Sequence, residues 1–230
     1  MIKCESRSRP DGARRGPIAF FDLLNGNKQS VALDLDTPRG LGLLDQLISE
    51  ADIIVESARP RALAQMGIDA ERCIRARPGQ VWVSITGHGR HGERGHWGGF
   101  GDDAAVAAGA VVQTAGTPDI CGDALAAPLT GQPAAVAALA HWRARRGALL
   151  DISLRAGVSL ALARAGPDRE VRVLARGAAW AVVDPCGEQP VAPPRARTVG
   201  RPAPALGAHT QQVRACLAQD DPARAAGGAS

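Results

Sequence analysis

The sequence predicts an α/β fold with a mainly parallel sheet and flanking helices. Between residues 31 and 86, segments with strand and helix patterns alternate as strand, helix, strand, helix, strand. Such alternation is typical of βαβ units, whose strands lie parallel. The chain has 230 residues, of which 45% are hydrophobic, so it can bury one sizeable core or two small ones.

In the N-terminal part, short apolar runs predict the strands, and capping signals with helical periodicity predict the helices. Thr37 and Pro38 suit the N-cap and first position of a helix, and leucines at helical spacing extend that helix to Glu50. Gly67 separates two short helices that follow. The expected strands are 2–5, 31–35, 52–56 and 80–86, the expected helices are 38–50, 60–65 and 69–75, and the basic segment 6–19 is expected to be a loop.

The remainder of the chain is richer in glycine, alanine and proline. The glycine-rich segment 87–101 is expected to be a mobile loop, and the Pro/Arg-rich segment 185–205 to be irregular. An alanine-rich run after Asp123 predicts a long helix. The further expected elements are helices over 103–112, 123–146 and 208–218 and strands over 149–154, 170–175 and 179–184.

Composition excludes several classes of function. The net charge is +4, the arginines are scattered, and aromatic residues are only 3% of the chain, which argues against a nucleic-acid platform and suits small anionic ligands. The five cysteines are far apart and lack metal-ligand spacing, so we expect reduced thiols, no metal and a cytoplasmic protein. No signal peptide is expected in residues 1–20, and no apolar run is long enough to span a membrane.

Asp123 is the most informative single residue, because it directly precedes the long alanine-rich helix. An aspartate there can cap the helix by accepting its first unpaired N–H groups. The same positive helix end keeps a carboxylate ionised and therefore available as a nucleophile. The residues alone leave both interpretations open.

Several motifs occur in an order that resembles one known family. Residues 25–35 (Asn-Gly-Asn-Lys-Gln-Ser-Val-Ala-Leu-Asp-Leu) resemble the Gly-Lys-x-Ser-x-x-Leu-Asp-Leu stretch of family III CoA-transferases. That family includes formyl-CoA and carnitine CoA-transferases and is related to α-methylacyl-CoA racemase. Similar matches to its motifs occur at residues 52–60, 66–68, 81–89, 121–123, 145–154 and 206–210.

The resemblance implies a Rossmann-like fold and a function. Cys121-Gly122-Asp123 is similar to the motif that carries the family's catalytic aspartate, so Asp123 is expected to attack an acyl-CoA thioester and to form an aspartyl-CoA intermediate. Coenzyme A is then a substrate, together with an acyl donor and a carboxylic acid acceptor. The family forms dimers of interlocked rings, so a homodimer is expected.

The resemblance also suggests which residues contact CoA and substrate. Basic side chains suit the CoA phosphates, and Arg59 is the best placed because it follows the carboxyl end of a strand. Arg14 and Arg15 are further candidates for the phosphates, although most such residues are expected to be solvated surface charges. The expected CoA contacts are Lys3, Arg7, Lys28, Ser57, Ala58, Arg59 and Met66. The expected lid loop, which would exclude water from an acyl intermediate, includes Gly87, His88, Gly89, Gly98 and Gly99.

Asp102 is a second catalytic candidate. It occupies the position of a histidine that serves as an acid–base group in the related racemases. Two carboxylates, Asp102 and Asp123, can exchange a substrate proton only if their pKa values are pushed apart, so racemization ranks below transfer. Alternatively, Asp102 or Asp103 caps the helix that follows.

Compared with the family, the chain opens at what resembles the second Rossmann strand and is short between Leu154 and Pro204. We therefore expect a Rossmann-like domain over 1–155, a shortened small domain or linker over 156–205, a C-terminal helix over 206–218 that returns to the main domain, and a disordered tail over 219–230. A non-catalytic remnant that binds CoA or a partner subunit is the alternative function.

Overall fold

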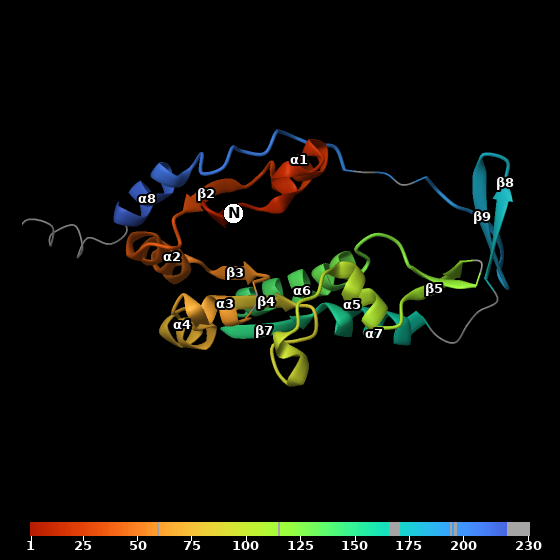
Figure 1. Cartoon of the computed structure of the whole chain (residues 1–230), viewed down its shortest axis with the longest axis horizontal. Helices are drawn as coiled ribbons and strands as arrows, with labels where there is room; N and C mark the ends of the chain where they lie inside the picture. The colour runs from red at the N-terminus through yellow and green to blue at the C-terminus, as the bar shows by residue number, and fades with distance from the viewer. Residues whose placement is uncertain (59, 115, 166–170, 194, 196, 220–230) are drawn as a thin grey trace, which may run out of the picture. The chain divides into compact units, whose positions relative to one another are not determined.

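The computed structural model describes every residue except 59, 115, 166–170, 194, 196 and 220–230 (Figure 1). The chain forms two compact units from interleaved segments. Unit 1 comprises Met1–Asp52, Gln65–Asp69 and Ala196–Ser230, and unit 2 comprises Ile53–Ala64 and Ala70–Arg195. This division differs from the domain boundaries that the sequence predicts at residues 155 and 205. Those boundaries stay a prediction.

Unit 1 is built on two parallel strands, β1 (Ile2–Ser6) and β2 (Gln29–Leu33). Their connection is more ordered than the loop expected over 6–19, since it contains the 3-10 helix η1 (Gly12–Arg15) and then α1 (Ile18–Asn25). A helix of eight residues presents too few turns for a periodic signal in the sequence. The apolar side chains of β2 are buried almost completely.

Two helices pack on β2. One is α2 (Pro38–Glu50), where Thr37 accepts a hydrogen bond from the amide of Gly40 at 3.1 Å, as the N-cap prediction requires. The other is α8 (Thr210–Gln219), which lies beside α2 (Figure 1). Its buried Val213 joins Val31 and Leu33 in one core with leucines of α2. The C-terminal helix therefore packs on β2 and α2 within unit 1.

The segment before α8 covers the open edge of β2. His209 Nδ1 accepts a hydrogen bond from the amide of Ser30 at 3.1 Å, and the amide of His209 donates to the Ser30 carbonyl at 2.9 Å. Thr210 Oγ1 accepts from the amide of Ala32 at 3.0 Å. These hydrogen bonds satisfy backbone groups that an edge strand otherwise leaves exposed.

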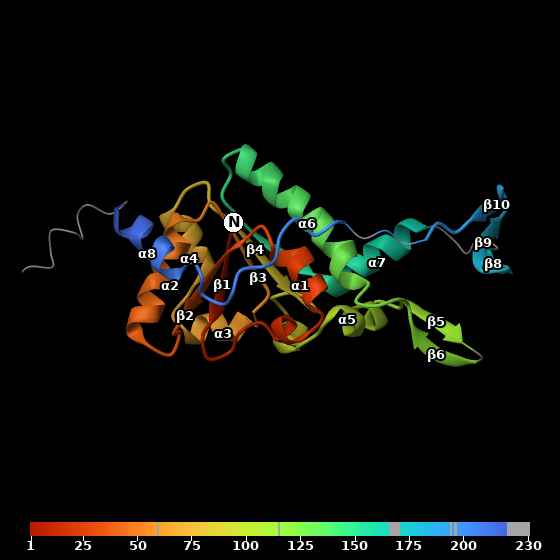
Figure 2. The same ribbon diagram turned by 90° about the horizontal axis from the view of Figure 1, so that it is seen from above.

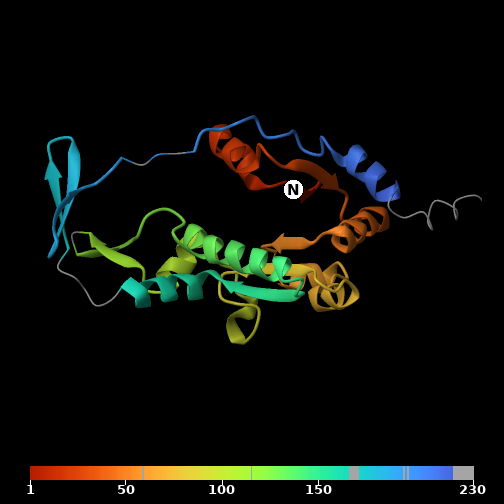
Figure 3. The same ribbon diagram turned by 180° about the vertical axis from the view of Figure 1, so that it is seen from behind.

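Unit 2 contains a parallel sheet in the order β3 (Ile53–Glu56), β4 (Val81–Thr86) and β7 (Ala148–Ser153). The crossover from β3 to β4 carries the short helices α3 (Pro60–Gln65), whose last residue belongs to unit 1, and α4 (Ala70–Ala76). The long helix α6 (Ala126–Arg143) runs along the sheet (Figure 3). Its Ala134 and Ala138 pack against Val81 and Val83. The fold class predicted from the sequence is confirmed.

Between β4 and α6 the structure departs from the sequence prediction. Residues 93–96 form the 3-10 helix η2 (Glu93–His96), and the helix expected over 103–112 is the shorter α5 (Gly101–Ala107). Gly109, with φ of 92°, ends the helical segment. The β-branched residues that follow form β5 (Val111–Thr114), which pairs with β6 (Thr117–Ile120) as an antiparallel hairpin (Figure 2).

After β7, the structure contains elements that the sequence analysis missed or shifted. Helix α7 (Leu154–Ala165) directly follows the strand and packs on α6. A small antiparallel sheet comprises β8 (Arg172–Arg176), β9 (Ala179–Asp184) and β10 (Gly187–Pro190). Among the described residues, none of the helices is both long and apolar enough to cross a lipid bilayer.

Candidate functional site

Asp123 lies in the turn that joins β6 to α6. The residues on either side of the turn, Cys121 and Leu125, pack against a buried core that includes Ala104, Ala105 and Val158. The side chain of Asp123 itself is exposed. Because its flanking residues are anchored in the core, the turn presents the Asp123 carboxylate at the surface of unit 2.

Asp123 does not cap α6. The helix begins at Ala126, its N-cap residue is Leu125, and no side chain caps it by a hydrogen bond. Gly122 and Ala124 both have positive φ, of 76° and 49°, and this backbone takes Asp123 out of the capping position. The capping interpretation of Asp123 is therefore wrong.

Asp102 contacts the turn that carries Asp123. It is partly buried in the first turn of α5, and its Oδ1 accepts a hydrogen bond from the amide of Ala124 at 2.6 Å. The neighbouring Gly101 packs so closely on Ala124 that an added Cβ would lie 2.9 Å from its Cα. Asp103 has the capping role that the sequence left open, since its Oδ2 accepts from the amide of Phe100 at 2.9 Å.

The expected lid loop closes on itself through glycine contacts. An added Cβ on Gly87 would lie 3.1 Å from Gly99 Cα, so the two ends of the loop can meet only without side chains. His88 packs edge-on against Trp97 with ring centroids 5.7 Å apart, and the amide of Gly89 donates to Thr86 Oγ1 at 2.8 Å. The fifth lid residue, Gly98, is exposed beside Trp97. A lid function for this loop stays a prediction.

A charged network that sequence reasoning missed anchors this loop to the carboxyl edge of the sheet. The amide of Arg90 donates to both carboxylate oxygens of Asp151 on β7, at 3.1 Å each. Its guanidinium donates to Ser84 Oγ at 2.9 Å and lies 3.6 Å from Glu56 Oε1. The sequence feature that could have indicated this network is Asp151, because a carboxylate within a short strand needs a polar partner.

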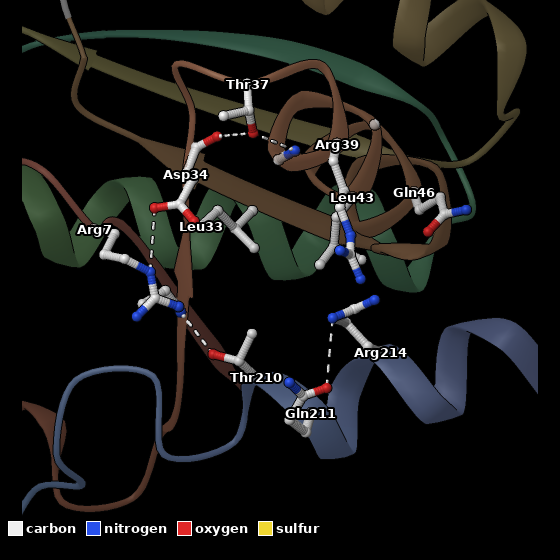
Figure 4. Close-up of a pocket in the computed structure, with 13 residues that line it drawn as sticks. Arg7, Leu33, Asp34, Thr37, Arg39, Leu43, Gln46, Thr210, Gln211 and Arg214 are labelled. Atoms are coloured by element: carbon white, nitrogen blue, oxygen red, sulfur yellow. Dashed lines mark hydrogen bonds and ion pairs between the residues drawn. The ribbon is translucent and has the colours of Figure 1, made fainter.

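Unit 1 contains a pocket of about 430 Å³ where β2 ends and α2 begins (Figure 4). Three arginines line it, Arg7 after β1, Arg39 in the first turn of α2 and Arg214 on α8. Asp34 is the only acidic residue among its lining residues, and its Oδ1 lies 3.2 Å from Arg7 Nε. Both of these side chains are more than half exposed, so their attraction is weak.

Arg39 and Arg214 point toward each other across the pocket (Figure 4). Arg214 also donates to Gln211 Oε1 at 3.5 Å. Two guanidinium groups directed at one space favour a ligand with negative charge, and the N-terminus of the 13-residue α2 adds to that preference. Sequence reasoning identified Arg7 here but missed Arg39 and Arg214, since the latter is brought in only by the packing of α8.

The two lysines expected at CoA lie elsewhere in unit 1. Lys3 forms an ion pair with Asp11 at 2.7 Å, and Lys28 donates to Asn25 Oδ1 at 3.1 Å. Burial and then the charge of Lys3 lower the pKa of Lys28. Because β1 and β2 are parallel, Lys28, which precedes β2, lies at the opposite end of the strands from Arg7. Neither lysine lines the pocket.

Arg14 is engaged within unit 1. It forms a bidentate ion pair with the buried Glu5, with Nε–Oε1 and Nη2–Oε2 distances of 2.9 and 2.6 Å. It also stacks over the Phe21 ring at 4.7 Å and donates to Ser30 Oγ. This arginine therefore stabilises the fold of unit 1 rather than being a solvated surface charge.

The remaining expected CoA contacts follow β3. Ser57 is exposed, and the amide of Ala58 donates to Glu56 Oε2 at 2.8 Å. Met66 is partly buried in the turn between α3 and α4, next to Gly67 with φ of 75°. Arg59 lies outside the described residues. In the part of the chain that the structure describes, no three His, Cys, Asp or Glu side chains lie close enough together to hold a metal ion.

Comparisons with known proteins agree on one family. The family model for CoA-transferase family III matches residues 1–170. The chain is 30% identical over 173 residues to succinyl-CoA–D-citramalate CoA-transferase of Chloroflexus aurantiacus, covering 69% of this chain and 43% of that protein. It is 30% identical over 168 residues to succinyl-CoA:glutarate CoA-transferase of Mus musculus, covering 67% of this chain and 38% of that protein.

A solved structure shares the fold of this chain. The crystal structure of a CAIB/BAIF family protein from Brucella suis superposes with a TM-score of 0.68 at 24% identity, covering 80% of this chain and 58% of that one. This chain thus spans roughly two fifths to three fifths of the length of these three relatives. The matched segment includes β1 to β7, the Asp123 turn and Arg7 of the pocket. The chain belongs to CoA-transferase family III.

Proposed function

We propose that the protein transfers CoA between an acyl-CoA thioester and a carboxylic acid, with Asp123 as the nucleophile. The observation that carries this proposal is the Asp123 turn. Its carboxylate stands at the family's aspartate motif, is exposed, and is held by anchored neighbours instead of capping α6. A carboxylate that is not used as a cap remains available to react.

The chemistry needs no proton transfer and no redox partner. An Asp123 oxygen attacks the thioester carbonyl, and the C–S bond breaks. CoA thiolate departs, and Asp123 and the acyl group are joined in a mixed anhydride. The thiolate then attacks the aspartyl carbonyl and forms aspartyl-CoA. The donor acid is released and takes with it the oxygen that bridged the anhydride. The acceptor carboxylate attacks the aspartyl carbonyl and expels CoA thiolate, which finally attacks the acceptor acyl carbon. The new acyl-CoA leaves, and the Asp123 carboxylate is restored.

The basic pocket of unit 1 supports CoA as the substrate. Coenzyme A carries a pyrophosphate and a 3′-phosphate, and arginine recognises phosphates with paired N–H donors. Arg39 and Arg214 face one another with Asp34 as the only lining acid, so a phosphorylated ligand offsets their mutual repulsion. The position, at the carboxyl end of parallel strands beside a helix N-terminus, is where α/β folds bind nucleotides.

Transfer is favoured over racemization by what Asp102 contacts. A racemase needs a second acid–base group that is able to exchange a proton with substrate. Asp102 Oδ1 instead accepts a hydrogen bond from the amide of Ala124 at 2.6 Å, so this carboxylate is engaged with the backbone of the turn. This use of Asp102 supports a fixed structural role rather than proton shuttling.

Binding without catalysis is the second candidate function. The three-arginine pocket lies entirely within unit 1, whereas Asp123 lies in unit 2, so CoA binding and chemistry can be tested separately. The chain spans only 43% of the length of its C. aurantiacus relative. A chain that binds CoA but never reacts at Asp123 would have this second function.

The deciding experiment is covalent trapping at Asp123. The protein is incubated with succinyl-CoA, the donor named for two relatives, and then with hydroxylamine, and the peptide containing Asp123 is analysed by mass spectrometry. We expect a hydroxamate at Asp123 in the parent protein and none in Asp123→Asn. D-citramalate and glutarate are the first acceptors to test. Failure to trap Asp123 with succinyl-CoA or a panel of other acyl-CoA donors would contradict catalysis, and retained CoA binding would then support the second function.

A further inference from the structure

We propose that Asp102 is a positioning residue for Asp123, which it holds through the backbone of Ala124. The inference rests on the proposed function of Asp123. Asp102 touches neither of the reacting groups in this scheme. Its carboxylate instead fixes the turn from which Asp123 attacks, so that the nucleophile is presented in one orientation.

The hydrogen bond between Asp102 and Ala124 is short and partly shielded from water. Asp102 Oδ1 and the Ala124 amide nitrogen are 2.6 Å apart, and Asp102 is partly buried, which limits competition from water. Since Ala124 directly follows Asp123, its amide belongs to the peptide unit that begins at the Asp123 carbonyl. A carboxylate that holds this peptide plane restrains the backbone of Asp123 directly.

The turn adopts a conformation that needs such a restraint. Ala124 has φ of 49°, in the left-handed region that residues with a Cβ rarely occupy, and only one other non-glycine residue in the described chain shares a positive φ. Strained backbone persists where surrounding contacts fix it, and such strain is concentrated at functional sites. The hydrogen bond from the Ala124 amide to Asp102 is a contact of this kind.

Packing places Asp102 and the turn in one rigid frame. Gly101 lies directly against Ala124, where an added Cβ would come within 3.0 Å of the Ala124 carbonyl oxygen. Ala104 and Ala105 of α5 share their buried core with Cys121 and Leu125, the residues that flank the turn. The helix that carries Asp102 therefore cannot move independently of the segment that carries Asp123.

Asp103 provides a matched control. It is the adjacent carboxylate on the same helix and accepts a backbone amide in the same way, but its partner is Phe100 and not the Asp123 turn. Asp103→Ala removes the same charge and one hydrogen bond from α5. If the trapping rate and the protection of the Ala124 amide fall in the Asp102 variant but not in the Asp103 variant, the effect comes from the positioning of Asp123 and not from the stability of α5.

Two measurements on the full chain test the proposal. Amide hydrogen exchange at Ala124, followed by NMR, is expected to accelerate at least about tenfold in Asp102→Ala and to remain slow in Asp102→Asn, whose amide oxygen still accepts, and in Asp103→Ala. The rate of Asp123 trapping with succinyl-CoA and hydroxylamine is expected to fall about 10²-fold in Asp102→Ala, with the Kd for CoA unchanged, and to recover most of its value in Asp102→Asn.

The outcomes are distinguishable from those for the proposed function. Unchanged Ala124 exchange in Asp102→Ala, a parent-like trapping rate in that variant, or no recovery in Asp102→Asn each overturns the positioning role. If the parent protein is never trapped at Asp123, the proposed function fails. The exchange measurement then still decides whether Asp102 holds the turn, because it does not depend on activity.

Discussion

At the scale of single residues, the backbone of one turn determines what Asp123 can do. Positive φ at Gly122 and Ala124 removes Asp123 from the N-cap position of α6, which a carboxylate before an alanine-rich helix would otherwise take. The result is an exposed carboxylate on a fixed backbone. Capping of α5 is left to Asp103, and Asp102 is left to contact the turn.

The pocket arginines give a residue-scale prediction about binding. Replacing Arg39 or Arg214 by alanine is expected to weaken CoA binding about 10- to 100-fold, because each loses charge-assisted hydrogen bonds to phosphate worth about 1.5–3 kcal/mol. Isothermal titration calorimetry with CoA measures this. Arg176→Ala, which removes an exposed arginine paired with Glu188, is the control and should leave the Kd unchanged. Equal Kd values for all three variants would contradict the assignment of the pocket.

Glu5 gives a residue-scale prediction about pH. Burial raises the pKa of Glu5, but hydrogen bonds from Arg14 and the Asp11 amide, with the charge of Lys3, lower it below its ordinary value of 4.5 overall. The hydrogen bond from Lys3 likewise lowers the pKa of Asp11. Since the folded values lie below the unfolded ones, this stability is complete above about pH 4.5 and is lost as the pH falls through the depressed folded values.

The measurement is urea unfolding, followed by circular dichroism, between pH 7 and pH 3. Glu5→Gln is expected to lose about 3 kcal/mol at pH 7, because Arg14 then keeps a partly buried charge without its carboxylate. Its free energy of unfolding should fall less steeply than that of the parent below pH 4.5. Parallel pH curves for the two proteins would show that the Glu5–Arg14 pair does not contribute as described.

At the scale of elements, α7 packs on α6 through a glycine. An added Cβ on Gly157 would lie 3.1 Å from Thr130 Cβ on α6, and closer still to its hydroxyl. Thr130 is buried and donates to the Leu154 carbonyl at 3.4 Å, so it cannot simply turn away. This contact places α7 beside the core that underlies the Asp123 turn.

Gly157→Ala and Gly131→Ala form a pair with opposite expected signs. The first is expected to destabilise by about 1–3 kcal/mol through overpacking. The second lies within α6, where an added Cβ would meet no heavy atom within 4 Å, and should stabilise by about 0.5–1 kcal/mol because alanine loses less entropy on folding. Chemical unfolding of both variants checks this. Equal signs would contradict the close α6–α7 contact.

Some elements of the fold could be predicted from the sequence and others could not. Thr37 and Pro38 marked the start of α2 correctly, and the apolar run of β4 is buried as such runs are in parallel sheets. The β5–β6 hairpin was missed because its strands have only four residues each and the helical pattern of α5 was extended across Gly109 to residue 112. Arg214 and the Asp102–Ala124 contact were not predictable, since tertiary packing brings together residues 22 or more positions apart.

At the scale of the whole molecule, segments distant in sequence build each unit. Residues 1–52 share unit 1 with the C-terminal segment, and the pocket draws its arginines from both. Family membership is established over residues 1–170, while the activity of the whole protein and its substrates are proposals, because the chain spans 43% of its C. aurantiacus relative.

A homodimer, which the family resemblance implies, is the prediction at this scale. Light scattering coupled to size-exclusion chromatography should give twice the mass of one chain at micromolar concentration. The resemblance implies interlocked chains, and exposed apolar side chains such as Val136 and Leu139 on α6 would be covered in such an assembly. A mass equal to a single chain across the accessible concentration range would contradict it.

Isotope transfer into Asp123 tests the central claim most directly. Succinyl-CoA is incubated with succinate labelled by ¹⁸O in both carboxylates, in unlabelled water, so that donor and acceptor are the same acid. In the proposed sequence the acceptor oxygen that bridges the second anhydride remains on Asp123, so the peptide containing Asp123 should gain about 2 Da in a single turnover of the parent protein and nothing in Asp123→Asn. Movement of CoA onto labelled succinate without ¹⁸O in Asp123 would contradict nucleophilic attack by this residue.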